Sequence, residues 1–273
     1  MSGYGVRLER MGHKDRIALI TLDRPERRNT MNEAMWSGLE DVTSGLERQL
    51  PRAVIITGAG DRAFCAGMDV NPDNPQIGSL VEAVQKHERE PVALLIRRLR
   101  TAIDSFVTLP VPIIAAMNGL AYGGGAELAI RCDLRVMDPG AVICFSEVRL
   151  GLMPDWGGGV TLARLIGHSK AADLILTARR VMAQEAYKLD IVNRISKPGK
   201  ALEESIELAE LIARNGPMAV RSALEAMRRA RDLSHEKALE AEEDLAVSLI
   251  ATGECYHGVM AFLSKEEPDF PDI

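Results

Sequence analysis

Hydrophobic positions along this chain follow two spacings, one typical of strands and the other typical of helices. Two β-rich runs, at residues 6–11 and 16–22, flank the polar stretch GHKD and predict a β-hairpin. Residues 32–49 then carry apolar side chains at the spacing of one helix face: Met35, Leu39, Val42 and Leu46. The chain is therefore expected to begin with a hairpin and an amphipathic helix.

Unbroken apolar runs further along predict buried strands that lead into glycine-containing loops. RAVIITGAG ends at Gly58 and Gly60, and PVPIIAAMNG is a second run of the same kind. A polar loop and a long helical pattern up to Leu109 separate the two runs. AELAIRCD has the composition of a helix, and LRVMD and AVICF indicate two more short strands. Strand, loop and helix alternate, which predicts an α/β core.

From about residue 197 the pattern changes to three or four amphipathic helices with almost no strand signal. Their sequences are ALEESIELAELIARN, PMAVRSALEAMRRAR, SHEKALEAEEDLAVSLIAT and GVMAFLS. We therefore predict a core at residues 1–196 and a C-terminal helical region at residues 197–273. Such a region packs either on its own core or on a neighbouring subunit.

Composition argues against several classes of function. The 273 residues are 47% hydrophobic and 26% charged, with a formal net charge of -6 and a pI near 5.5. The chain has no long block of basic residues, so no nucleic-acid partner is expected. No apolar run reaches the length of a membrane span, and the N-terminal stretch lacks the apolar core of a signal peptide. We therefore expect a cytoplasmic protein without a membrane partner.

The four cysteines, at positions 65, 132, 144 and 255, are far apart and form no Cys-x-x-Cys pair. No histidine stands at metal-ligand spacing, so a reducing compartment and no bound metal are expected. Cys65 lies in the glycine loop GDRAFCAGMD, but no partner histidine occurs at a recognisable spacing. An ordinary loop cysteine is therefore favoured over a thiol nucleophile.

Three consecutive glycines stand before the predicted helix in NGLAYGGGAELAIRCD. Without a Cβ the backbone can turn sharply and be approached closely, and the first amides of a helix have no intrahelical acceptor. The loop at residues 60–69 could bring a second amide beside the first, which would make an oxyanion hole. Tight strand-to-helix packing and an ordinary turn are the other interpretations of these two loops.

Two acidic residues accompany the glycine loops. Glu127 lies in the first turn of the predicted helix, and Glu147 follows the last short strand. Acidic residues at helix starts and strand ends are usually solvated surface groups. Their joint placement beside two glycine loops favours a catalytic role.

Five segments occur in a familiar order across nearly the whole chain: LDRPERRNTMNEAM, DRAFCAGMD, MNGLAYGGGAELAIRCD, FSEVRLGLMPDWGGGVTLARLIG and FLSKEEPDF. Together they resemble the enoyl-CoA hydratase/isomerase (crotonase) superfamily. The resemblance implies an α/β, crotonase-like (ClpP/crotonase) spiral of repeated ββα units with a C-terminal helical trimerisation region. It also implies an acyl-CoA thioester substrate and a homotrimer or a hexamer that is a dimer of trimers. Coenzyme A would be part of the substrate, and no separate cofactor is expected.

The same resemblance implies roles for individual residues. The backbone amides of Met68 and Gly124 would form the oxyanion hole, and Glu127 and Glu147 would be the acid/base pair. This pattern is most characteristic of an enoyl-CoA hydratase, which adds water across the 2,3 double bond and gives a 3-hydroxyacyl-CoA through an enolate. The assignment of acid and base stays open, with Glu147 preferred as the proton donor to C2.

The segment GLMPDWGGG departs from straightforward hydratases, which usually have a small residue after the proline. Asp155 matches a position where some relatives, including dienoyl-CoA isomerases and a dehalogenase, carry a catalytic aspartate. An enoyl- or dienoyl-CoA isomerase is therefore the alternative function, and a non-catalytic acyl-CoA- or RNA-binding relative is a second. A helix N-cap is the other interpretation of Asp155. Trp156 would either line the acyl pocket or fill the core.

Contacts with CoA are predicted from two of the same segments. The backbone of Ala66 and Met68 would meet the adenine and pantetheine side of CoA, as the family loop does. Arg24 or Arg28 in DRPERRN would neutralise CoA phosphates. A solvated basic turn is the other interpretation of these arginines.

Overall fold

The computed structural model describes residues 2–272 and begins with the predicted hairpin and helix. Strand β2 (Val6–Met11) pairs antiparallel with β3 (Ile17–Leu22), and β1 (Ser2–Gly3) pairs with β2. Helix α1 (Glu33–Arg48) follows, and the side chain of its N-cap residue Asn32 accepts a hydrogen bond from the helix. The hairpin and the helix expected from the hydrophobic spacing are both confirmed.

Three strand–strand–helix units come next, and each gives one strand to a large sheet and one to a small sheet. The first unit has β4 (Ala53–Gly58), β5 (Ala63–Cys65), α2 (Pro75–Gln85) and α3 (Arg89–Val107). The second has β6 (Ile113–Met117), β7 (Leu120–Tyr122) and α4 (Gly124–Arg131). The third has β8 (Leu134–Met137), β9 (Val142–Cys144), α5 (Gly158–Ile166) and α6 (His168–Thr177).

Three short elements complete the sheets: β10 (Val181–Met182), α7 (Ala183–Lys188) and β11 (Arg194–Ile195). The large sheet has the order β1-β2-β3-β4-β6-β8-β11, and the small sheet has the order β10-β9-β7-β5. Because successive units add neighbouring parallel strands to both sheets, the chain advances as a spiral. The predicted repetition of ββα units is confirmed.

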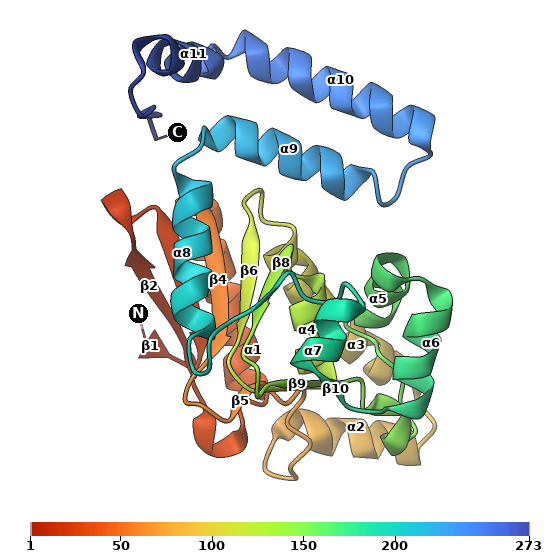
Figure 1. Ribbon diagram of the computed structural model, residues 1–273. Coiled ribbons are helices and arrows are strands. Elements are labelled where there is room, and N and C mark those ends of the chain that lie inside the picture. Colours follow the sequence, from red (N-terminus) through yellow and green to blue (C-terminus); the bar gives the residue numbers. More distant parts are fainter. Residues whose placement is uncertain (1, 273) are drawn as a thin grey trace.

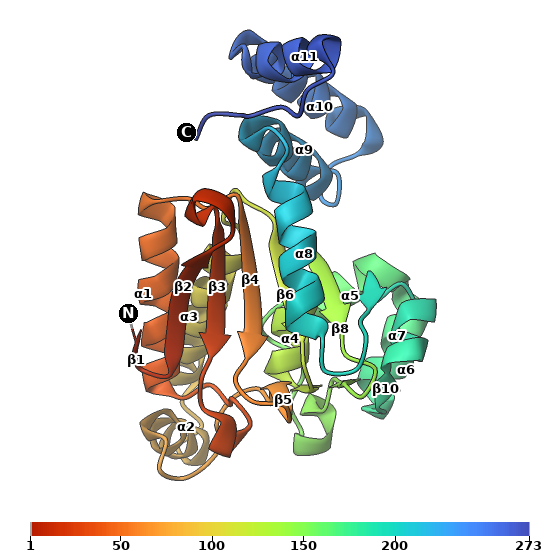
Figure 2. The same ribbon diagram turned by 60° about the vertical axis from the view of Figure 1, so that its left-hand side comes forward.

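Both faces of the large sheet are covered, which explains why its central strands are hydrophobic without interruption. In β3, Ile17 and Leu19 pack in one cluster with α8 (Ala201–Ala213), whereas Ala18 and Ile20 pack in the cluster that holds α1 and α3. Figure 2 shows α8 along one face of the sheet and α1 and α3 on the other. Alternate side chains of one strand therefore belong to two cores.

The last three helices, α9 (Pro217–Arg229), α10 (His235–Ala251) and α11 (Glu254–Ser264), form a layer that stands away from the sheets (Figure 1). The C-terminal run of helices is thus confirmed. The domain division at residue 196 stays a prediction, because α8 follows that point in the sequence and still packs on the sheet.

Within residues 2–272, no single helix is both long and apolar enough to cross a membrane. Helices α10 and α11 satisfy that test of length and composition only when taken together, and they are bent by 71° at the break between them.

Glu254 holds the C-terminal layer together by capping a neighbouring helix. Its buried carboxylate accepts hydrogen bonds from the amides of Met218 (2.9 Å) and Ala219 (2.8 Å), in the first turn of α9. We expect Glu254→Ala to lower the free energy of unfolding by ~1–2 kcal/mol, because both amides lose their acceptor. Chemical denaturation measures this change. The exposed Glu243 in α10 supplies the control Glu243→Ala, and equal losses in the two variants would contradict the capping role.

Candidate active site

Glu127 is positioned by two helices from different units of the spiral. It lies in the first turn of α4 and is only 1% exposed. One carboxylate oxygen, Oε1, accepts a hydrogen bond from the amide of Asp155 (3.1 Å), and Oε2 accepts one from the amide of Gly158 (2.8 Å). Since Gly158 is the first residue of α5, the carboxylate caps the N-terminus of that helix.

Gly158 is a functional residue that sequence reasoning missed. A Cβ at this position would lie 2.5 Å from both Cα and Cβ of Glu127, a distance that no side chain tolerates. Only glycine therefore lets α5 approach Glu127 closely enough to donate its first amide. The signal in the sequence was the second glycine run, in PDWGGG.

Glu147 approaches the same place from the third unit. It begins a short 3-10 turn (Glu147–Leu150) just after β9 and is 9% exposed. A Cβ at Gly123, the residue before α4, would lie 3.6 Å from Oε1 of Glu147, so this carboxyl group faces the start of α4. Neither carboxylate oxygen has a hydrogen-bond partner in the part of the chain that the structure describes. The predicted pair of glutamates is thus brought together.

Burial gives both glutamates unusual protonation behaviour. Loss of water raises the pKa of Glu127 to about 8, and the charge of Glu147 adds to the effect, while the amide donors oppose it. Burial also raises the pKa of Glu147. Because the two carboxyl groups interact, they release their protons in coupled steps and hold a shared proton at neutral pH.

The two predicted oxyanion-hole amides lie in loops that touch one another. A Cβ at Gly67 would lie 3.1 Å from the amide nitrogen of Gly124. The carbonyl of Gly67 accepts a hydrogen bond from the amide of Met31, and the amide of Asp69 donates one to the carbonyl of Met31. Because backbone groups alternate in direction along an extended chain, the amide of Met68 between them points away from Met31. Gly124 opens α4, where the amide has no intrahelical acceptor. Across residues 2–272, neither amide donates a hydrogen bond to another group of the protein.

The structure overturns one interpretation of Asp155. The N-cap of α5 is Gly157, with no side-chain hydrogen bond, so Asp155 is not the helix cap that its sequence position suggests. The carboxylate of Glu127 has taken over that end of the helix. The Asp155 side chain is exposed at the edge of the site, and its charge acts on both glutamates. Partial loss of water raises its pKa.

Trp156 lies behind Gly124 and is 4% exposed. A Cβ at Gly124 would lie 2.4 Å from Cζ3 of its ring, so the ring is pressed against that glycine. Trp36 of α1 packs edge-on against it, with the ring centroids 4.7 Å apart. Trp156 therefore belongs to the core that supports Gly124, and a role in lining the acyl pocket stays a prediction.

The residues predicted to contact CoA have different surroundings. The guanidinium of Arg24 is bonded to the buried carboxylate of Asp69, next to Met68, and thereby anchors the loop of residues 60–69. The Arg28 side chain is exposed, and its carbonyl accepts the amide of Ala66 (3.0 Å). The backbone amide of Ala66 is therefore already used, and only its carbonyl could bind a ligand. The CoA contacts of all four residues stay predictions.

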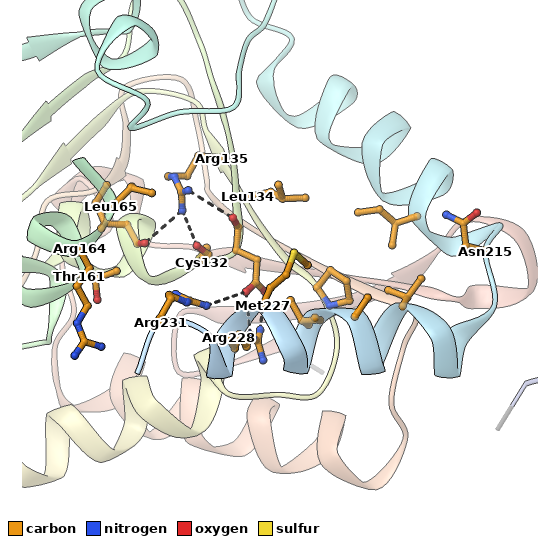
Figure 3. Close-up of a pocket in the computed structure, with 17 residues that line it drawn as sticks. Cys132, Leu134, Arg135, Thr161, Arg164, Leu165, Asn215, Met227, Arg228 and Arg231 are labelled. Atoms are coloured by element: carbon orange, nitrogen blue, oxygen red, sulfur yellow. Dashed lines mark hydrogen bonds and ion pairs between the residues drawn. The ribbon is translucent and has the colours of Figure 1, made fainter. Parts of the chain in front are cut away.

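Two further features bear on what the site could hold. Among the described residues, no group of three or more histidine, cysteine, aspartate or glutamate side chains could hold a metal ion. A cavity of about 570 Å³ lies at the far end of α4, between the core and α9, and contains none of the residues above (Figure 3).

Comparison with known proteins agrees with this geometry. Residues 12–272 match the family model described as enoyl-CoA hydratase/isomerase. The protein YngF of Bacillus subtilis is 36% identical over 260 residues, which cover 95% of this chain and 96% of YngF. The 2,3-dehydroadipyl-CoA hydratase of Escherichia coli is 31% identical over 260 residues, covering 95% of this chain and 97% of that enzyme.

A solved structure has the same fold along almost its whole length. The crystal structure of an enoyl-CoA hydratase from Bacillus anthracis matches with a TM-score of 0.88 and 33% sequence identity, and the match covers 97% of this chain and 98% of that one. The architecture is therefore the crotonase fold. By sequence and by structure, the chain belongs to the enoyl-CoA hydratase/isomerase family.

Proposed function

We propose that this protein is an enoyl-CoA hydratase, which adds water across the 2,3 double bond of an enoyl-CoA thioester. The observation that carries the proposal is the buried pair Glu127 and Glu147, which lies beside two backbone amides with no protein acceptor. Hydration needs a base for the water, an acid for C2 and a site for negative charge on the thioester oxygen. This arrangement offers all three.

In the proposed reaction the thioester oxygen accepts hydrogen bonds from the amides of Met68 and Gly124. A carboxylate removes one proton from a water molecule while the oxygen of that water bonds to C3. The electrons of the double bond move toward the thioester carbonyl, and the amides stabilise the resulting enolate. The second carboxyl group then protonates C2, so that one water molecule has been added. The scheme itself calls for no metal or redox cofactor.

The hydrogen bonds of the pair support Glu147 as the acid. Two amides donate to Glu127, which favours its ionised form. The described chain has no donor to either oxygen of Glu147, so the shared proton is better placed there. Glu127 would then be the base that activates water, and Glu147 would protonate C2.

Asp155 favours a second candidate function, the isomerisation of enoyl- or dienoyl-CoA. Its exposed carboxyl group lies close enough to both glutamates for its charge to affect their pKa values. A third carboxyl group at the edge of the site could exchange a proton with carbon atoms farther along the acyl chain. The amides would stabilise a dienolate in the same way.

We also propose that the protein assembles as a homotrimer, alone or as a dimer of trimers. Helix α10 has no buried residue within the described chain. Large apolar side chains are exposed on α10 and α11, namely Leu239, Val247, Ile250, Tyr256, Val259, Met260, Phe262 and Leu263. An apolar surface of this kind is typical of a subunit interface.

Substitution of the three carboxyl groups distinguishes the two reactions. We expect Glu127→Gln and Glu147→Gln each to lower kcat for crotonyl-CoA hydration by about 100-fold or more, since each removes one partner in proton transfer. Asp155→Asn should change hydration less than about fivefold, because Asp155 takes no part in that scheme. Loss of the 2-enoyl absorbance, together with incorporation of labelled water, measures the reaction.

The same variants are assayed with 3-enoyl- and 3,5-dienoyl-CoAs. Isomerisation by the unsubstituted protein that collapses in Asp155→Asn would replace the hydratase proposal with the isomerase. A protein that binds acyl-CoA or RNA but converts no enoyl thioester would instead be the non-catalytic relative.

The shared proton predicts a pH dependence. Since the pKa of Glu127 is raised to about 8, the pair keeps its proton at neutral pH and loses it as the pH rises through that value. We expect kcat/KM for hydration to fall about tenfold per pH unit above this point, because the acid form is lost. A profile measured from roughly pH 6 to pH 10 tests this. Unchanged kcat/KM across it would contradict the shared proton.

If the exposed apolar surface of α10 and α11 is the subunit interface, a charge placed there should disrupt the oligomer. Phe262 in α11 is 80% exposed, and we expect Phe262→Glu to shift the protein from trimer or hexamer toward monomer, because a charge would be buried at the interface. Light scattering after size exclusion measures the mass. Glu47→Gln on the exposed surface of α1 is the control. A monomeric unsubstituted protein would contradict the proposed assembly.

A further inference from the structure

Arg135 is a buried charge at the end of α4 opposite the candidate active site. It belongs to β8, and only 4% of the residue is exposed. Figure 3 shows its guanidinium beside Cys132, in the segment that joins α4 to β8, with hydrogen bonds to backbone carbonyl groups. Its position raises the question of what balances the charge.

The guanidinium is balanced by backbone carbonyls alone. Its Nη1 donates to the carbonyls of Ile130 (3.3 Å) and Cys132 (2.5 Å), which lie at the C-terminal end of α4, and its Nε donates to the carbonyl of Ile191 (2.6 Å). The neighbouring carboxylate of Asp133 is paired with Arg228 at 2.6 Å. Within residues 2–272, no carboxylate lies within 4.0 Å of the Arg135 guanidinium.

A buried cation without a carboxylate partner is costly, so its position needs a compensating interaction. The last carbonyls of a helix have no intrahelical donors, and they form the negative end of the helix dipole. Arg135 supplies both donors and positive charge at this end. Helix α4 is buried along nearly its whole length, so water screens the charge poorly.

The other end of α4 carries the groups of the proposed reaction. Gly124, whose amide faces the thioester oxygen in that proposal, is its first residue, and Glu127 lies in its first turn. With 8 residues, the helix is about 12 Å long. At the effective dielectric typical of protein interiors, a unit charge at about that distance changes the stability of an anion about tenfold.

We propose that Arg135 is a positioning residue of the active site, which holds α4 by its C-terminal carbonyls and strengthens binding of the enolate oxygen at its N-terminal amide. The proposal rests on the proposed function. The positive charge of Arg135, and not only its hydrogen bonds, would stabilise the enolate. An arginine that only fastened β8 to α4 would leave the preference for an anionic thioester unchanged.

The test compares two ligands that differ in charge at the oxyanion hole. Acetoacetyl-CoA forms an enolate, whereas butyryl-CoA is a neutral saturated thioester. The ratio of their dissociation constants, measured by calorimetry, reports how strongly the site favours the anion. We expect Arg135→Gln to reduce the preference for acetoacetyl-CoA about tenfold, with the dissociation constant of butyryl-CoA little changed. We expect kcat to fall by a similar factor, with KM nearly constant.

Arg135→Lys keeps the charge but cannot reach the carbonyls of both Cys132 and Ile191. It should lower the ratio about threefold, which is less than the loss in Arg135→Gln, because the charge is kept but shifted. If Arg135→Gln does not fold, an unchanged ratio in Arg135→Lys would overturn the inference. Arg52→Gln is the control for loss of a buried arginine at a helix C-terminus, although Arg52 also pairs with the carboxylate of Asp272 at 2.8 Å. Arg52 is also buried, and it donates to the carbonyl of Ala213 at the end of α8, far from the site. It should lower thermal stability but leave the ratio unchanged.

Three outcomes are distinguishable. Folded Arg135 variants with the ratio and kcat of the unsubstituted protein would overturn the inference and leave the hydratase proposal intact. Equal losses in the Arg52 and Arg135 variants would also overturn it, because the effect would then be general. An unsubstituted protein that binds neither thioester would overturn the proposed function and this inference together.

Discussion

The structure depends above all on the contact between the Glu127 carboxylate and the N-terminus of α5. Glu127 lies on α4, in the second unit of the spiral, and the amides that donate hydrogen bonds to it belong to the third unit. The contact fixes the carboxylate, satisfies the first amide of α5 and brings the segment of Asp155 to the site. It requires Gly158, because any Cβ there would overlap Glu127. One side chain thus joins the folding of two units to the proposed chemistry.

Burying Glu127 and Glu147 lowers the free energy of unfolding at neutral pH. Burial raises the pKa of both carboxyl groups, to about 8 for Glu127 against an ordinary 4.5, so the folded pair keeps a proton that the unfolded chain releases above about pH 4.5. The free energy of unfolding therefore falls as the pH rises from 4.5 toward 8, which is the opposite of the usual effect of a paired carboxylate. Amide donors at Glu127 offset part of this cost, whereas Glu147 has no such donor among the described residues. This unfavourable burial of carboxyl groups lies where proton transfer is proposed.

The sequence allowed prediction of whatever depends on neighbouring residues or on a repeated motif. The hairpin, α1, the buried strands and the C-terminal helices follow from hydrophobic spacing, and the ββα spiral follows from the family resemblance. Contacts between distant segments escaped prediction. Asp155 looks like a helix cap until Glu127 occupies that helix end. The pair of Arg24 and Asp69 joins residues 45 positions apart, while the contact of Arg24 with CoA stays a prediction. Strands β5 and β7, of 3 residues each, depend on pairing within the small sheet, where β7 lies between β5 and β9.

The ends of two helices explain why the site is compact and why it needs so many glycines. An N-terminus offers amides without acceptors. Here the first amide of α5 donates to Glu127, while the amide of Gly124 in α4 has no acceptor among the described residues and is the one proposed to bind the thioester oxygen. Gly124 is packed against the Trp156 ring and Gly158 against Glu127, which leaves no room for side chains at either glycine. At its opposite end, α4 has its carbonyls bound by Arg135, so the whole helix is fixed between a cation and the proposed enolate. A short buried helix can therefore act as a rigid electrostatic element, because both of its ends are held by specific partners.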